Sequence, residues 1–174
     1  MNRKTKKSER VAIVGVMAAF AAILSYIEAL IPFSIWIPGV KLGLANIAIV
    51  VVLYLYGANE ALAVNFVRVI IVGMLFGNVF STLFSLAGAA VSFCVMLAVK
   101  KTDCFTIIGV SVAGGTAHNI GQILVASAVI NSYSVIYYLP ALIIAGVVTG
   151  IVIGLVSRLL IKYIMPFVKG RAGI

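Results

Sequence analysis

Long apolar stretches constrain this chain more than any other feature. From Val11 to Ile164 they follow one another with short polar or basic connections between them. Several reach the ~20 residues that a helix needs to cross the hydrocarbon core of a bilayer. Hydrophobic residues make up 64% of the sequence and charged residues only 10%, which is more apolar surface than a soluble fold of 174 residues can bury. We therefore expect one all-α domain, an integral membrane bundle.

The breaks between stretches predict six transmembrane helices. Pro32 ends the first stretch, Pro38 fits the first turn of the second, and Gly57 fits the position after its C-terminus. The expected spans are about 11–31, 38–56, 59–76, 79–99, 105–130 and 140–163. This gives a basic cytoplasmic tail at 1–10, a six-helix membrane domain at 11–164 and a cytoplasmic C-terminal tail at 165–174.

The basic residues predict the orientation of the bundle. With the N-terminus inside, ten Lys and Arg residues fall on the cytoplasmic side and only Lys41 falls outside, so both termini are expected in the cytoplasm. The net charge of +9 then reflects topology, and no nucleic-acid partner is expected. The basic start runs into a spanning segment without a cleavage pattern, which argues against a secretory leader. Cys94 and Cys104 are not expected to form a disulfide.

Small residues at a spacing of four predict where helices pack closely, because lipid provides no hydrophobic drive between helices. The fifth and sixth spans each carry such a stripe: Gly109, Ala113, Ala117 and Gly121 in the fifth, and Gly146, Gly150 and Gly154 in the sixth. In the first span, Gly15 with Ala19 and Ala18 with Ala22 form two small faces. Two alternatives remain for these: packing inside the bundle, or docking of another membrane protein.

Polar side chains inside the apolar stretches are the candidate site, since a charge at mid-bilayer costs at least about 2.5–3.5 kcal/mol. With the orientation above, they fall between the membrane centre and the outer surface. The expected ligand-binding set is Glu28, Lys41, Asn46, Arg68, His118, Asn119 and Gln122. Asn65 lies on the same helical face as Arg68. The balance of Arg68 and Lys41 against Glu28 favours a ligand with polar or anionic groups.

Structural roles are the alternatives for each member of this set. Glu28 and Arg68 could form an internal ion pair, and Asn46 and Asn65 could join helices by hydrogen bonds. His118 could be a buried histidine with no ligand, and Lys41 a surface anchor. Arg158, near the inner end of the sixth span, is expected to extend to the headgroups.

Several chemistries lack the residues that they need. No nucleotide-binding P-loop occurs, Asp103 is the only aspartate, and one histidine with two distant cysteines predicts no zinc site. Four acidic residues also leave no Ser/His/acid set. We expect no enzyme activity and no cofactor in the chain itself, so active uptake would draw its energy from a partner or an ion gradient.

Four segments resemble one bacterial membrane family: 38–46 (PGVKLGLAN), Arg68 followed by Gly73, 83–88 (LFSLAG) and 114–122 (GGTAHNIGQ). It is the Gx transporter family, also labelled heptaprenyl diphosphate synthase component I. The family is similar to the substrate-binding S components of energy-coupling factor (ECF) transporters. The resemblance implies a six-helix fold in the bacterial cytoplasmic membrane. It also implies uptake of a vitamin-like molecule from the extracellular side, and a flavin, with its aromatic ring and polar tail, would suit the expected pocket.

The same resemblance implies partners and further site residues. S components work with a transmembrane coupling protein and two cytoplasmic ATPases, which use the ATP. By that likeness, Ala18 and Ala22 become the docking contact on the first helix, with Gly15 and Ala19 alongside. The loop with Trp36, Pro38 and Gly39 would cover the mouth of the site.

Three hypotheses follow. The first is an S-component-like subunit for micronutrient uptake. The second is an accessory membrane subunit that partners a prenyl diphosphate synthase or an extracytoplasmic flavin or redox protein and transports nothing itself. The third is a small ion-coupled carrier in which Glu28 or His118 titrates.

Overall fold

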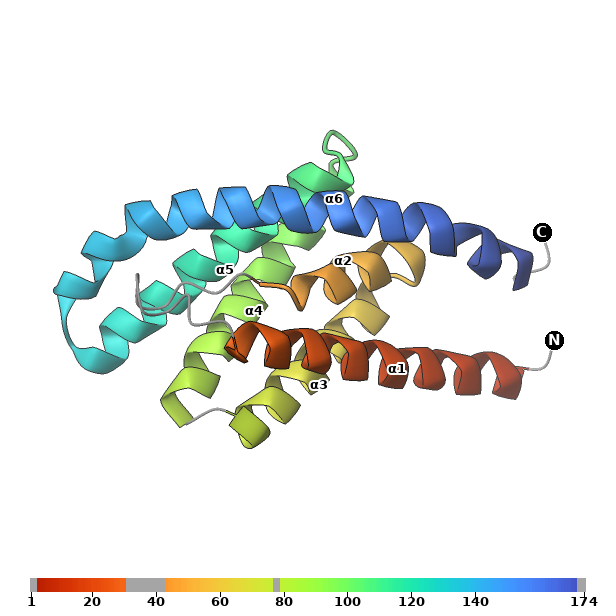
Figure 1. The fold of residues 1–174 in the computed structure, drawn as a ribbon, viewed down its shortest axis with the longest axis horizontal. Coiled ribbons are helices and arrows are strands. Elements are labelled where there is room, and N and C mark those ends of the chain that lie inside the picture. Colours follow the sequence, from red (N-terminus) through yellow and green to blue (C-terminus); the bar gives the residue numbers. More distant parts are fainter. Residues whose placement is uncertain (1–2, 31–42, 77–78, 172–174) are drawn as a thin grey trace.

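The chain folds as a bundle of helices (Figure 1). The computed structural model describes residues 3–30, 43–76 and 79–171, and no strand occurs among them. The helices are α1 (Arg3–Leu30), α2 (Asn46–Leu55), α3 (Ala58–Phe76), α4 (Val79–Lys101), α5 (Ile107–Ile130) and α6 (Leu139–Arg171), with a 3₁₀ helix, η2 (Tyr133–Tyr138), between α5 and α6. The expectation of an all-α fold is confirmed over these residues.

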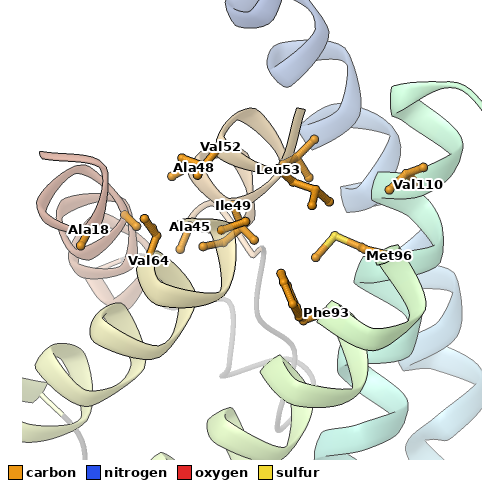
Figure 2. Close-up of a cluster of buried hydrophobic side chains, with 13 residues drawn as sticks. Ala18, Ala45, Ala48, Ile49, Val52, Leu53, Val64, Phe93, Met96 and Val110 are labelled. Carbon is orange, nitrogen blue, oxygen red and sulfur yellow. The ribbon is translucent and has the colours of Figure 1, made fainter. Parts of the chain in front are cut away.

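Helix α2 is the centre of the bundle. It contacts α1, α3, α5 and α6, and its residues from Asn46 to Leu53 are all buried. It is apolar on every side, as expected for a helix with neighbours all round. Its Ile49, Val52 and Leu53 pack with Met96 of α4 and Val110 of α5 in the main core (Figure 2).

In the part of the chain that the structure describes, four helices are long and apolar enough to cross a membrane: α1, α3, α4 and α6. Helix α5 has 24 residues without Asp, Glu, Lys or Arg, and its polar His118, Asn119 and Gln122 lie near its middle. Helix α2 has only 10 residues, about 15 Å, which is half of the hydrocarbon thickness. The expected start of a helix at Pro38 lies outside the described residues. Within them, α2 begins at Asn46. The number of crossings stays a prediction.

Most of the expected helix ends are confirmed. Gly57, with φ +111°, follows α2 and donates its backbone N–H to Val52 O, as a C-terminal glycine does. Asn131, with φ 55°, ends α5 in the same left-handed region. Helix α6 continues past the expected end of the last span near Tyr163 to Arg171, with Pro166 inside it. Pro166 has no backbone N–H to donate to the carbonyl of Lys162, so α6 lacks one backbone hydrogen bond there.

The glycine stripe of α6 marks a close helix contact, as predicted. A side-chain carbon added at Gly146, Gly150 or Gly154 would lie 3.0, 2.6 or 2.7 Å from a Cα atom of α5. These Cα atoms belong to Thr116, Val112 and Ile108. Gly121, the last residue of the α5 stripe, faces α4 instead: a carbon added there would meet Val91 and Gly88. Helix α5 is therefore held closely on two sides.

Polar contacts join the helices at one end of the bundle. Arg10 Nη1 of α1 lies 3.1 Å from Glu60 Oε1 of α3. Lys100 of α4 donates to the carbonyl of Leu53 near the end of α2, and its Nζ lies 4.6 Å from the centre of the Tyr54 ring. The Arg3 end of α1 and the Arg171 end of α6 lie at one end of the bundle, and η2 lies at the opposite end (Figure 1).

The α5–α6 contact gives a first prediction. Gly150→Ala should lower the thermal midpoint of the detergent-solubilised protein, because the new methyl group would meet the α5 backbone. Overpacking of this kind costs about 1–3 kcal/mol, or a few degrees at about 2–4 °C per kcal/mol. The measurement is a thermal scan read by size-exclusion chromatography.

Gly15→Ala is the matched control, since no atom lies within 4 Å of a carbon added at Gly15. Alanine favours a helix by up to about 1 kcal/mol over glycine, so this variant should be neutral or slightly stabilised. Equal midpoints for the two variants would contradict close packing at Gly150.

Candidate functional site

Arg68 is a cation inside an apolar helix, and Asn65 holds it in place. Arg68 Nη2 donates to Asn65 Oδ1 at 3.1 Å, one helical turn away on α3. Asn65 is 6% exposed, and its Nδ2 donates to the carbonyl of Ala89 on α4 at 3.3 Å. Arg68 Nε is buried and has no hydrogen-bond partner in the described part of the chain. The guanidinium is thus fixed on one side and unsatisfied on another.

Glu28 is engaged with the backbone just before α2. Its Oε1 accepts from Gly43 N at 2.9 Å and its Oε2 from Leu44 N at 3.0 Å. Gly43 has φ +73°, a conformation that glycine adopts without strain. The negative charge of Glu28 acts on Arg68, yet no ion pair within 4 Å joins them in the ranges that the structure covers. The alternative of a direct Glu28–Arg68 ion pair is therefore not what these residues form.

Asn46 belongs to the same cluster as Glu28. It is the first residue of α2, is 8% exposed, and donates its backbone N–H to Gly43 O at 2.8 Å. Its side-chain Nδ2 would lie 3.3 Å from a carbon added at Gly43. Glu28 and Asn46 therefore both contact Gly43, which lies just before α2.

His118 and Gln122 lie together between α5 and α4. They are 8% and 9% exposed. A carbon added at Gly88 of α4 would lie 2.6 Å from Gln122 Cγ and 3.1 Å from His118 Cε1. Gly88 precedes Ala89, whose carbonyl accepts from Asn65, so this turn of α4 is contacted by polar residues of both α3 and α5.

Asn119 is directed elsewhere. Its Nδ2 donates to the carbonyl of Leu142 on α6 at 2.8 Å, and it is 3% exposed. The structure thus gathers Glu28 with Asn46, Arg68 with Asn65, and His118 with Gln122, and it places Asn119 at the α5–α6 contact.

The remaining predicted residues divide into two sets. Lys41 and the loop residues Trp36, Pro38 and Gly39 lie outside the described residues. On α1, Ala18 is 2% exposed in the core with Ala45 and Val64, so it packs inside the bundle, the first of its two alternatives. Gly15 and Ala19 are exposed and Ala22 is half-buried.

Some polar positions were not expected to matter. Asn65 was predicted only as a residue that joins helices, but it both joins α3 to α4 and orients Arg68; the spacing of three from Arg68 was the available signal. The hydroxyls of Ser92 and Ser157 are buried without a hydrogen-bond partner among the described residues, and no sequence signal distinguishes these serines. Within the same ranges, no three His, Cys, Asp or Glu residues are grouped to hold a metal ion.

Comparison with known proteins places this geometry in a family. The family model for heptaprenyl diphosphate synthase component I matches residues 17–160, which include α2 to α5, the second half of α1, most of α6 and every residue of the candidate site. No curated protein and no solved structure matches the chain. Since the match covers far more than half of the sequence, the chain belongs to the heptaprenyl diphosphate synthase component I family, also called the Gx transporter family.

Proposed function

We propose that this membrane protein is a substrate-binding subunit, similar to an ECF S component, that takes up a small organic anion from the outer side. The observation that carries the proposal is Arg68. Its guanidinium lies in an apolar helix, has a buried N–H without a partner in the described residues, and has no carboxylate bound to it there.

The energetics of Arg68 support an anionic ligand. A charged side chain in a membrane helix costs at least about 2.5–3.5 kcal/mol, and a buried donor left unsatisfied costs about 1–3 kcal/mol more. Glu28, the carboxylate whose charge acts on Arg68, already accepts two backbone N–H groups. A carboxylate or phosphate on the ligand would satisfy the open side of the guanidinium, which favours planar, two-point hydrogen bonding.

Other polar residues would complete the site. His118 and Gln122 bring an imidazole and an amide to the α4–α5 contact, at the turn of α4 that Asn65 also reaches. Amide and imidazole groups can both donate and accept, so they suit the mixed polar edge of a vitamin-like molecule such as a flavin. Glu28, Asn46 and Lys41 would lie at the outer side of this site, under the loop that carries Trp36, Pro38 and Gly39. Asn119, bonded to α6, supports the wall and does not touch the ligand.

Partner subunits would supply the energy for uptake. The sequence has no P-loop, so ATP would be used by cytoplasmic ATPases acting through a transmembrane coupling protein. The exposed Gly15 and Ala19 of α1 offer a small surface for such a contact, with Ala22 at its edge. The protein itself would be non-catalytic and would act in the bacterial cytoplasmic membrane with both termini in the cytoplasm.

The family name favours a second candidate: an accessory membrane subunit that partners a prenyl diphosphate synthase. Prenyl diphosphate chemistry depends on carboxylate-bound Mg²⁺, and a single aspartate in the whole sequence does not suit that role. The chain would therefore bind the synthase and leave the reaction to it.

Ligand binding gives the most direct prediction. Riboflavin 5′-phosphate and pyridoxal 5′-phosphate should each be compared with the unphosphorylated molecule in a thermal-shift screen of the purified protein. We expect at least one anionic member to raise the midpoint more than its neutral partner, since a ligand at about 100 times its Kd stabilises by about 2.7 kcal/mol. Arg68→Gln should abolish that difference.

Arg158→Gln is the control, because Arg158 is an exposed arginine in the second half of α6. It should leave the ligand shift unchanged. A panel in which no compound shifts the midpoint, or an Arg68→Gln variant that responds like the wild type, would count against an anion site.

Asn65 gives a separate prediction about the orientation of Arg68. Asn65→Leu removes both hydrogen bonds and should weaken binding of the responding anion about tenfold or more, since hydrogen bonds to charged groups contribute about 1.5–3 kcal/mol. Asn65→Asp keeps an acceptor for Arg68 but supplies a negative charge beside it. This variant should weaken binding of the anion and leave binding of its neutral analogue unaffected. Calorimetry on folded variants measures both, and equal losses for the two compounds would indicate a purely structural role.

The two candidate functions predict different partners. Affinity purification from a native membrane should recover a coupling protein and ATPases if the protein is a transport subunit. Recovery of a soluble prenyl synthase, without ATPases, would support the accessory role. Gly15→Leu should release the coupling protein in the first case and leave a synthase bound in the second.

A further inference from the structure

The connection between α5 and α6 exposes an unusual set of aromatic side chains. Tyr133 and Tyr137 of η2 are 85% and 88% exposed, Tyr138 is 46% exposed and Ile136 is 38% exposed. No residue of η2 is buried, and Tyr133, Ser134, Ile136 and Tyr137 line an open hollow on its surface. The helices to which η2 is attached leave this aromatic surface uncovered.

The connection is nevertheless held rigidly. Asn131 ends α5, Ser132 N donates to Ser127 O at 3.3 Å, and Ser127 Oγ donates to Ser132 O at 3.1 Å. At its other end η2 runs straight into α6, where Leu139 N donates to Ile136 O. The tyrosines therefore project from a short helix that is hydrogen-bonded at both ends.

Charge is missing over this whole part of the chain. From Cys104 to Ser157 the sequence has no Asp, Glu, Lys or Arg, so η2 lies in the middle of a long segment without a charged side chain. A loop that extends into water normally carries such groups. The chemistry of η2, with phenol hydroxyls on apolar rings, is that of side chains enriched at the boundary between lipid and water.

The length of α6 gives an independent estimate of the depth of η2. Arg158 is the first charged residue after Leu139, and the helix between them rises roughly 30 Å at 1.5 Å per residue. This matches the hydrocarbon thickness of about 30 Å. With the exposed Arg158 extending to the headgroups of one leaflet, Leu139 and η2 lie at the interface of the other leaflet.

We infer that η2 is an interfacial anchor that inserts Tyr133 and Tyr137 among the glycerol and ester groups of the leaflet opposite the two chain termini. The hydroxyls bond to lipid carbonyls and the rings lie on the outer ends of the acyl chains. The anchor fixes the depth of the α5–α6 pair, and with it the depth of His118 and Gln122 on α5. This inference does not rest on the proposed ligand.

Depth-dependent fluorescence quenching tests the anchor. The chain has one tryptophan, so Tyr137→Trp in a Trp36→Phe background gives a single reporter. It should be reconstituted in phosphatidylcholine vesicles with bromine at a shallow or a deep acyl position. We expect quenching by the shallow bromines to exceed that by the deep ones about twofold, with little quenching by aqueous iodide. Tyr133→Trp in the same background should give the same order and serves if the first variant fails to fold.

Phe66→Trp provides the matched control, since Phe66 is 57% exposed near the middle of α3. Its fluorescence should be quenched more by the deep bromines. A tryptophan at 137 that iodide quenches and bromines do not would show that η2 extends into water. Shielding from both quenchers would show that a second copy or another segment covers it; either outcome would overturn the anchor.

Discussion

Helix α2 is too short to cross a bilayer, and the rest of the structure depends on how its two ends are satisfied. A 10-residue helix is about 15 Å long, half of the hydrocarbon thickness, and an end that lies in the hydrocarbon has no water to bond its free N–H and C=O groups. Glu28 accepts the backbone N–H groups of Gly43 and Leu44 ahead of α2, and Lys100 donates to the carbonyl of Leu53 near its end. Two of the few charged side chains, Glu28 and Lys100, thus bond to backbone groups at the two ends of this helix.

That use of Glu28 determines the electrostatics of the site. The carboxylate of Glu28 is directed to the backbone N–H groups of Gly43 and Leu44, and it forms no ion pair within 4 Å with the guanidinium of Arg68 in the described residues. Asn65 satisfies one N–H of Arg68 without neutralising the charge. The cation is therefore oriented but not paired within the described residues, which is the condition under which an anionic ligand gains most. A buried arginine already paired with a carboxylate would have to break that contact first.

The sequence revealed what depends on local chemistry. Apolar length identified the helices, Gly57 and Asn131 end two of them, and the spacing of Gly146, Gly150 and Gly154 identified a true helix contact. What it missed depends on the direction of side chains around each helix. In a membrane, both the lipid-facing and the inward-facing surfaces are apolar, so periodicity does not separate them. For this reason the sequence could not show that Ala18 is internal while Ala19 is exposed. Nor could it show that Asn119 bonds to α6 while its neighbour His118 faces α4.

The same contacts suggest how the bundle responds to a ligand. Helices α4 and α6 both pack closely against α5. A carbon added at Gly88 of α4 or at Gly150 of α6 would overlap atoms of α5, so neither helix can come closer to α5 without a clash. In the polar site, the described side-chain hydrogen bond from α3 to this unit is the one from Asn65 to Ala89 O. The proposed ligand would bond to the open side of Arg68, on α3, whereas the packing at Gly88 has no group to exchange. Any movement on binding is therefore expected in α3 relative to the closely packed α4–α6 unit, because hydrogen bonds can change partner while close backbone packing cannot.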